Sequence, residues 1–232
     1  RSFEKYHLTQ TPENGFGETP LKKYRRHIFL LHPNKVVIYD ELEANEKVRW
    51  DWLLHSPVKF DINPTASILT TVNKEKGFSS VVQLFCEQEA AITQTDKYAA
   101  PPNHADAQRG EDFTDPWSLT ASFGPSRNNR ILTIIQVEAD GRQAVQIMRE
   151  GNTFRCGEWV IEAELNAKRP GRLYIRNSRN NAVFSYGDKK PEINGELYSC
   201  KEKDASVLFD CVNGEWMVQE MGDQRVQTMG KW

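Results

Sequence analysis

Two histidines and two aspartates fall on three neighbouring strand-like segments, and their side chains are suited to holding a metal ion. His27 lies in the first segment, Asp40 in the second, and Asp51 and His55 in the third. Zinc takes imidazole nitrogen and carboxylate oxygen as ligands in tetrahedral sites. The pattern therefore predicts a zinc site formed by His27, Asp40 and His55. The alternative is a metal-free hydrogen bond between His27 and Asp40, with His55 elsewhere on the surface.

These residues meet only if the first two segments form a hairpin with one particular register. His32-Pro33-Asn34-Lys35 suits a type I turn, because Pro stands at its second position and Asn at its third. This turn places His27 opposite Asp40 and Arg26 opposite Glu41. A slip by one residue would set Asp40 against Ile28 and lose the charge pairing, so we expect the first register.

A second turn is expected at Ala44-Asn45-Glu46-Lys47, which would pair Tyr39 with Trp52. The opposite sheet face would then carry the candidate ligands, with Asp40 facing Asp51. Two carboxylates so placed repel each other unless a cation, a proton or a histidinium lies between them. The apolar face would collect Ile28, Leu30, Val37, Tyr39, Trp52 and Leu54.

The remaining chain shows strand patterns throughout and predicts an all-β fold. No window of roughly 11 to 18 residues has the apolar spacing of an amphipathic helix, whereas short alternating or apolar runs bounded by Gly, Pro, Asn and Asp recur. This spacing favours a large antiparallel β-sandwich. The predicted strands are Tyr24–Leu31, Val36–Glu43, Val48–His55, Ser67–Val72, Ser79–Cys86, Ala90–Thr95, Trp117–Phe123, Arg130–Val137, Gln143–Arg149, Glu158–Ala163, Arg172–Arg176, Ala182–Tyr186, Leu197–Lys201, Ser206–Asp210 and Glu215–Glu220.

The composition changes near Arg169-Pro170-Gly171. We therefore expect a main sandwich over residues 1–168 and a smaller terminal β-sheet region over residues 169–232, either as a separate unit or as part of the same domain. The stretch Tyr98–Pro116 has no periodicity and is long for a loop inside a domain. Such a loop either contacts substrate or is disordered.

The 232 residues are 38% hydrophobic and 10% aromatic, which is typical of a globular protein. Thirty Lys and Arg residues balance 32 Asp and Glu residues, and the basic residues are scattered, so nucleic acid is not a favoured partner. No apolar run is long enough to cross a bilayer. The chain begins with Arg1 rather than Met, and we expect a processed chain or a fragment.

The four cysteines lie far apart and lack the close spacings of zinc or redox motifs. We interpret them as isolated thiols. A bridge between Cys200 and Cys211 is the alternative, and it would require an oxidising compartment.

Three segments between Leu21 and Ser56 carry a family likeness: the basic strand Lys-Lys-Tyr-Arg-Arg-His, the strand Val-Val-Ile-Tyr-Asp and the strand Trp-Leu-Leu-His. Together they resemble the β-sandwich portion of heparinase II/III-type polysaccharide lyases. The resemblance implies large antiparallel sheets that follow an α/α toroid domain of the same protein. It also implies a periplasmic or secreted location and cleavage of uronic-acid-containing polysaccharides, such as glycosaminoglycans, by β-elimination. In several members, His, Asp and His on the sandwich bind zinc.

β-Elimination requires a base that removes the proton α to a carboxylate and a group that neutralises the developing charge. In the family most of these groups come from the toroid, which this chain does not contain. We therefore assign no catalytic residue and expect the chain to be inactive alone, forming one wall of the substrate cleft. Residues expected to touch an acidic sugar are Arg25, Arg26, His104 and Arg109, with plain surface charge as the alternative.

Two other functions fit the sequence. A freestanding carbohydrate-binding sandwich would need exposed aromatic side chains for sugar stacking, and Trp117, Trp159 and Trp216 are candidates unless they belong to the core. A purely structural sandwich would mediate dimer contacts and hold no ligand.

Overall fold

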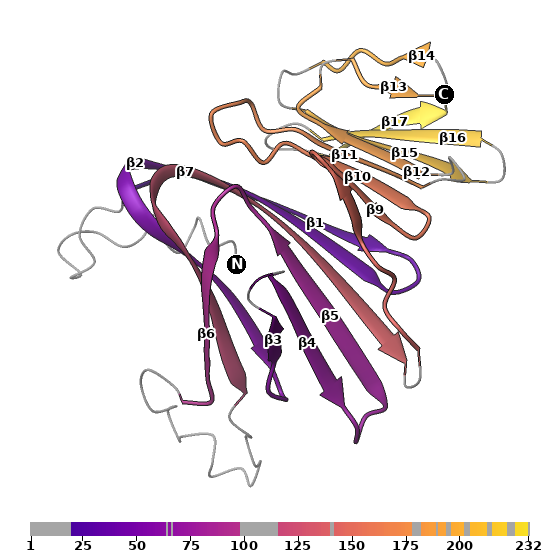
Figure 1. Cartoon of the computed structure of the whole chain (residues 1–232). Coiled ribbons are helices and arrows are strands. Elements are labelled where there is room, and N and C mark those ends of the chain that lie inside the picture. Colours follow the sequence, from indigo (N-terminus) through magenta and orange to yellow (C-terminus); the bar gives the residue numbers. More distant parts are fainter. Residues whose placement is uncertain are drawn as a thin grey trace, which may run out of the picture.

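The computed structural model consists of two antiparallel β-sheets packed against each other (Figure 1). It describes residues 20–63, 65, 67–97, 116–139, 142–177, 182–188, 190–193, 196–201, 205–212, 215–221 and 226–231. Within these ranges the regular structure is entirely strand, which confirms the predicted all-β antiparallel sandwich. No helix capable of spanning a bilayer occurs in this part of the chain.

The first sheet contains seven strands among the described residues. They are β1 (Leu21–Leu31), β2 (Lys35–Ser56), β3 (Asp61–Asn63), β4 (Ile68–Asn73), β5 (Phe78–Phe85), β6 (Ala90–Thr95) and β7 (Trp117–Ala139). The strand order is β1-β2-β7-β5-β4-β3, and β6 pairs with the beginning of β7.

The second sheet contains eight strands in the described part, in the order β17-β16-β15-β12-β11-β10-β9-β8. They are β8 (Met148–Glu150), β9 (Thr153–Cys156), β10 (Trp159–Ala163), β11 (Leu173–Asn177), β12 (Ala182–Tyr186), β15 (Ser206–Val212), β16 (Glu215–Met221) and β17 (Val226–Lys231). A two-stranded sheet pairs β13 (Glu192–Ile193) with β14 (Glu196–Leu197). Residues 169–171 lie between β10 and β11, so the second sheet already begins before the composition change noted there.

Two long bent strands, β2 and β7, dominate the first sheet. The expected turn at Ala44–Lys47 is wrong, because β2 continues through it and pairs with β7 from Lys35 to Ser56. The register shifts between Glu43 and Trp50, as bulges do where paired strands bend. Opposite this point β7 carries Gly124-Pro125. The sequence predicted separate strands at Trp117–Phe123 and Arg130–Val137, whereas the structure joins them in the single strand β7. The polar residues that suggested turns thus lie at a bend shared by two paired strands, seen at the upper left of Figure 1.

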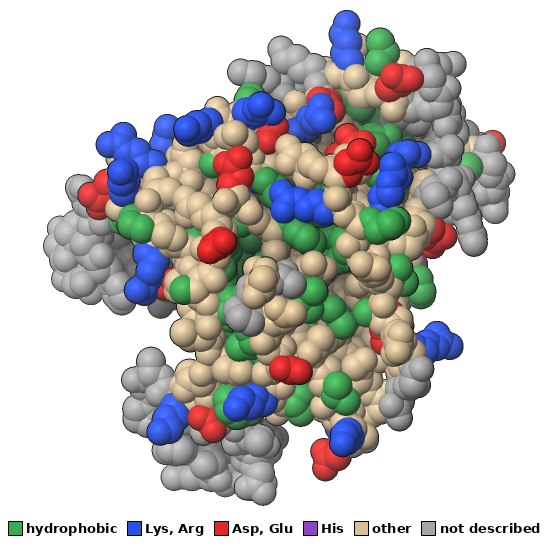
Figure 2. All heavy atoms as spheres, in the orientation of Figure 1, with side chains coloured by type: hydrophobic (Ala, Val, Ile, Leu, Met, Phe, Trp, Pro, Cys, Tyr) green, Lys and Arg blue, Asp and Glu red, His purple; other side chains and the backbone are tan. Residues whose placement is uncertain are grey.

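Apolar side chains pack on both faces of the first sheet. One core lies between the two sheets and contains Val37 and Tyr39 of β2 with Phe154 and Leu173 of the second sheet. The other lies on the opposite face and contains Leu42, Trp50 and Trp52. In the view of Figure 2, hydrophobic side chains gather in the hollow of the curved sheet, while charged side chains lie around its margin.

Candidate functional site

The β1–β2 hairpin has a register one residue away from the predicted one. Leu31 pairs with Lys35 across a three-residue turn, so Arg26 faces Asp40 and His27 faces Tyr39. The predicted pairing of His27 with Asp40 is wrong because the turn contains three residues rather than the two central residues of a type I turn. The observed register keeps a charge pairing at Asp40 but changes the partner to Arg26.

The predicted metal ligands are not brought together. His27 lies on the face directed at the second sheet, where its ring centroid is 4.3 Å from that of Tyr186. Asp40 lies on the opposite face with Arg26. His55 is exposed, and its Nε2 lies 3.3 Å from Ser118 Oγ. Among the described residues no group of three His, Cys, Asp or Glu side chains could hold a metal ion. The arrangement of His27, Asp40 and His55 therefore does not fit zinc.

His27 has a metal-free environment of its own. Its Nε2 is buried and has no hydrogen-bond partner. Burial lowers the pKa of the imidazole to about 4, with smaller contributions in the same direction from Arg25 and Lys23 and an opposing one from Glu41. His27 is therefore neutral at physiological pH and acts as an aromatic packing residue against Tyr186.

A cleft of about 450 Å³ opens where β2 bends away from β1. β1 pairs with β2 no further than Ala44, so the second half of β2 diverges from it beyond the bend. We call this the bend cleft. Its lining combines apolar, aromatic and charged side chains from three strands: Leu21, Tyr24, Arg26, Asp40, Leu42, Trp50, Asp51, Trp52, Leu53 and Ile131.

Aromatic residues form a large part of the lining of the bend cleft. Trp50 and Trp52 come from the same face of β2 and belong to the core on that face, with 9% and 4% of their surface exposed, so each presents only a small part of its ring to the cleft. The Trp50 indole is held in place because its Nε1 donates to the Ser126 carbonyl at 3.2 Å and hydroxyl at 3.1 Å. Tyr24 lies under the guanidinium of Arg26, 5.5 Å from ring centroid to Cζ. These rings are preorganised by the strands that carry them.

An ion pair between Arg26 and Asp40 lies next to these rings. Arg26 donates from Nε to Oδ1 at 2.6 Å and from Nη2 to Oδ2 at 2.9 Å. Asp40 is 1% exposed, and burial raises the pKa of its carboxyl, although the hydrogen bonds from Arg26 oppose that rise. The same contact raises the pKa of the Arg26 guanidinium. Two parallel hydrogen bonds of this kind fix the guanidinium plane within the cleft wall.

Asp51 also borders the cleft, but it stands between Trp50 and Trp52 in β2, so its carboxylate is directed to the opposite face of the strand. It does not face Asp40 across a hairpin but pairs with Ser122 of β7. Ser122 Oγ donates to Oδ1 at 2.7 Å, and Arg49 Nη2 donates to Oδ2 at 2.9 Å. The hydrogen bond from Ser122 and the weaker effect of Arg49 lower the pKa of Asp51. Asp51 is therefore ionised at neutral pH.

Of the predicted substrate-binding residues that the structure describes, Arg26 lines the cleft and Arg25 does not. Arg25 lies on the other face of β1, where its Nη1 donates to the Tyr186 hydroxyl at 2.8 Å. His104 and Arg109 lie outside the described residues, as does the loop that contains them. Sequence reasoning missed Trp50 as a site residue, although the alternation Trp50-Asp51-Trp52 is visible in the sequence.

The three tryptophans proposed as a sugar platform have other surroundings. Trp159 is buried and donates from Nε1 to the His32 carbonyl at 3.3 Å, so it belongs to the core between the sheets. Trp117 is half-buried beneath the ammonium of Lys59. The Trp216 side chain lies outside the described part. All four cysteines are free thiols.

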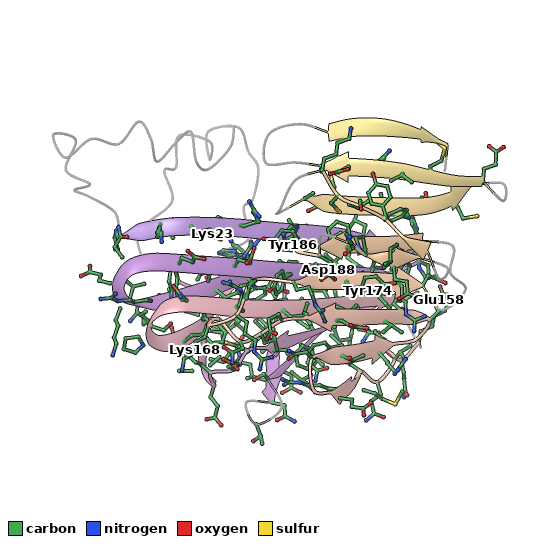
Figure 3. The ribbon with its side chains drawn as sticks, turned by 90° about the horizontal axis from the view of Figure 1, so that it is seen from above. Lys23, Glu158, Lys168, Tyr174, Tyr186 and Asp188 are labelled. Carbon is green, nitrogen blue, oxygen red and sulfur yellow. The ribbon has the colours of Figure 1, made fainter. Side chains whose placement is uncertain are left out.

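A buried polar cluster joins the sheets on the far side of β2 from the cleft. Glu41 is fully buried and receives hydrogen bonds or ion pairs from the Tyr186 hydroxyl, Arg130 Nη2 at 3.2 Å and Lys23 Nζ at 3.3 Å. Figure 3 shows Lys23 and Tyr186 close together where β1 meets the second sheet. Burial, followed by Glu41, raises the pKa of Tyr186 well above its ordinary value. This cluster is a structural tie rather than an open site.

A scan of known protein families and a search of curated proteins found no match for this chain. The functional argument is therefore carried by the geometry of the bend cleft.

Proposed function

We propose that this β-sandwich binds an acidic polysaccharide in the bend cleft, as the sandwich portion of a polysaccharide lyase of the heparinase II/III type. The observation that carries the proposal is the placement of the Arg26–Asp40 ion pair beside the rings of Trp50 and Trp52. Sugar rings present apolar C–H faces together with many hydroxyl groups. Aromatic walls with a few fixed polar groups match both properties.

The size and setting of the cleft support this proposal. Its volume of about 450 Å³ lies within the range of roughly 300–1,000 Å³ that is common for small-molecule sites. The cleft is bounded by paired strands rather than loops, so its walls are preorganised and ligand binding orders little of the chain.

Basic residues beside the cleft favour an acidic polymer. Lys22 follows the lining residue Leu21, and its side chain is 65% exposed. Glu43 lies 4.0 Å from the ammonium groups of both Lys22 and Lys23, so one carboxylate is shared between two cations. Lys23 is also paired with the buried Glu41, whereas Lys22 is largely exposed and can attract a polyanion from solution.

In this proposal the chain binds the glycan, and the α/α toroid domain of the same protein supplies the elimination chemistry in the periplasm or outside the cell. A tyrosine can act as the base only after it has lost its own proton. Burial and Asp40 raise the pKa of Tyr24, the tyrosine in the cleft wall, so it is not suited to that role. The isolated chain is therefore expected to bind uronic-acid oligosaccharides without forming unsaturated products. A freestanding carbohydrate-binding module would also bind these oligosaccharides without cleaving them. An assay of this chain together with its α/α toroid domain distinguishes the two functions, because cleavage is then expected only if the protein is a lyase.

Calorimetric titration with uronic-acid oligosaccharides tests the binding site. The double variant Arg26→Gln/Asp40→Asn removes both charges while keeping side chains of similar size. It is expected to weaken binding about 10- to 100-fold, the effect of losing a hydrogen bond to a charged group. Arg155→Gln, an exposed change on β9, is the matched control. Equal affinity of the double variant and the wild type would exclude the bend cleft as the binding site.

A further inference from the structure

The last residues of β1 form an apolar outer edge of the first sheet. Between Ile28 and Leu31 this strand pairs with β2 on one side, and the described residues place no strand on its other side. Ile28 is 59% exposed and Leu30 is 76% exposed, although both are large apolar residues. A free strand edge of this kind is a template for pairing with a further strand.

A groove of about 470 Å³ follows this edge, and we call it the edge groove. It is separate from the bend cleft, which lies beside Tyr24 and Arg26 nearer the start of β1. The lining of the edge groove is mostly apolar and comes from both sheets: Ile28, Phe29, Leu30, Leu31, His32, Glu158, Trp159, Ile175, Asn177, Ala182, Val183, Phe184, Leu208 and Asp210.

The second sheet continues past β1 and forms the floor of this groove. β1 packs face to face on β12, because the ring centroids of His27 and Tyr186 lie 4.3 Å apart and those of Phe29 and Phe184 lie 4.4 Å apart. The next strand, β15, pairs Leu208 with Phe184, and Leu208 is only partly buried. In Figure 3 the yellow C-terminal strands lie past β1, the outermost strand of the first sheet.

One further strand fits over this floor. Neighbouring strands of a sheet lie about 4.8 Å apart, so a strand added to β1 would lie over β15 as β1 lies over β12. Its residue opposite Phe29 would face Leu208. Its residue opposite Leu31 would face Asp210, which lies two residues further along β15. Alternate side chains of the added strand would therefore point into the groove.

The remaining side chains of an added strand would lie on the other face of the first sheet. There they would stand opposite Ile28 and Leu30, and apolar side chains at these positions would cover both residues. Cross-strand pairs of apolar side chains stabilise a sheet. The exposed part of β1 thus favours an apolar strand on this face as well as in the groove.

The charge of the groove selects a basic residue at one position. Both charged residues among the described lining, Asp210 and Glu158, are acidic. Asp210 is exposed at the floor, on the line of the added strand. A Lys or Arg opposite Leu31 would meet this carboxylate, whereas an acidic residue there would be repelled.

A second copy of the chain does not fit the edge groove. Two β1 strands paired antiparallel about a two-fold axis would carry both second sheets on the same side of the joined sheet. On that side β15 to β17 already project past β1, so the two second sheets would collide. A single extended segment avoids this collision.

We propose that the edge groove binds an extended peptide segment of another protein, which adds to β1 as an antiparallel strand. The segment has a basic residue followed by three apolar residues, opposite Leu31, Leu30, Phe29 and Ile28 in turn. Backbone hydrogen bonds to β1 supply affinity, and the groove selects the side chains. This site is independent of glycan binding in the bend cleft.

Fluorescence anisotropy of the full chain with a labelled, end-blocked peptide tests the proposal. The peptide carries Lys-Val-Phe-Val between flanking threonines and is expected to bind. The same peptide methylated on its backbone nitrogens keeps its side chains but cannot donate to β1, and we expect at least about tenfold weaker binding. Replacing its Lys by Gln is expected to weaken binding about two- to fivefold, the effect of one exposed ion pair.

Variants of the chain assign the contacts. Leu30→Thr is expected to weaken the Lys peptide about three- to tenfold, because apolar contact is lost. Val72→Thr, at a valine of β4 that is 59% exposed, is the matched control and is expected to change nothing. Asp210→Asn is expected to remove the difference between the Lys and Gln peptides, whereas Asp61→Asn, an exposed change on β3, is expected to preserve it.

Four outcomes would overturn the proposal. The Lys peptide does not bind, or the methylated peptide binds as tightly as its parent. The wild-type chain is a dimer in sedimentation and Leu30→Thr makes it a monomer, which would assign the edge to a second copy. The peptide binds only after removal of residues 1–19, which would assign the groove to this chain's own N-terminal segment.

Discussion

The hydroxyl of Tyr186 donates to the buried carboxylate of Glu41 and so joins two sheets through residues 145 positions apart in the chain. Glu41 belongs to β2 and also forms ion pairs with Arg130 of β7 and Lys23 of β1. Because β2 carries Asp40 and the tryptophans of the bend cleft as well, this contact holds the strand that forms the cleft against the second sheet.

Removing the Tyr186 hydroxyl tests this tie. Tyr186→Phe keeps the ring that packs on His27 but removes the donor to Oε2 of the buried Glu41, while Arg130 and Lys23 still pair with Oε1, so we expect a loss of about 1–3 kcal/mol in the free energy of unfolding. Urea unfolding followed by fluorescence measures the change. Tyr174→Phe, on a half-buried tyrosine of the same sheet, is expected to cost much less. Equal losses in the two variants would contradict a special role for the Glu41 contact.

Gly171 is required for a steric reason. A Cβ at this position would lie 1.8 Å from Glu41 Oε1, closer than any side chain tolerates. Gly171→Ala is therefore expected to destabilise the protein by about 1–3 kcal/mol or more, as overpacking does. Gly124→Ala is the matched control, since its Cβ would come no nearer than 3.9 Å to Gln88 Oε1. A lowered melting temperature in the control but not in Gly171→Ala would refute the close approach to Glu41.

The Arg26–Asp40 pair predicts a pH-dependent defect. Arg26→Gln leaves Asp40 buried without its cation, with an expected cost of about 3–5 kcal/mol at neutral pH. In that variant the carboxyl has a raised pKa, so the cost is present above that pKa and disappears as the pH falls through it and Asp40 takes up a proton. Denaturant unfolding at several pH values measures this. Asp40→Asn in the same background is expected to restore stability at neutral pH, and failure to do so would show that Arg26 acts through packing instead.

His27 predicts a second pH dependence. Its pKa is lowered from 6.5 to about 4 in the folded state, so below pH 6.5 the unfolded chain binds a proton that the native state does not. The stability associated with neutral His27 is complete above pH 6.5 and is lost as the pH falls to about 4, by on the order of 3 kcal/mol. His27→Phe is expected to flatten the stability profile in this window, and His55→Gln to leave it unchanged. An unaltered profile in His27→Phe would assign the acid sensitivity to other groups.

Zinc content tests the geometry of the hairpin directly. Because His27 and Asp40 lie on opposite faces of the sheet, His27→Ala and Asp40→Ala are expected to leave the zinc content of the purified, zinc-treated chain equal to that of the wild type. Elemental analysis measures it. Loss of stoichiometric zinc in both variants would mean that the two side chains share a ligand sphere, as the family resemblance implies.

The antiparallel all-β class could be predicted because alternation of apolar and polar residues is a local property, set by side chains that point to opposite faces of a strand. Most predicted strands, such as Ala182–Tyr186, recur with the same or similar bounds. Arg26 could likewise be named as a binding candidate from its place in a basic strand.

Other features depend on which strands pair, and the sequence alone does not determine that. The polar run at Ala44–Lys47 fits a hairpin turn as well as a bend, and only the pairing of β2 with β7 decides between them. The register of the β1–β2 hairpin depends on whether its loop has two or three residues. The third loop residue shifts the pairing by one position, so that His27 faces Tyr39 and lies on the opposite sheet face from Asp40. Side-chain alternation is determined by neighbouring residues, but the bend cleft and the Glu41–Tyr186 tie arise from contacts between distant segments, whose pairing only the folded chain selects.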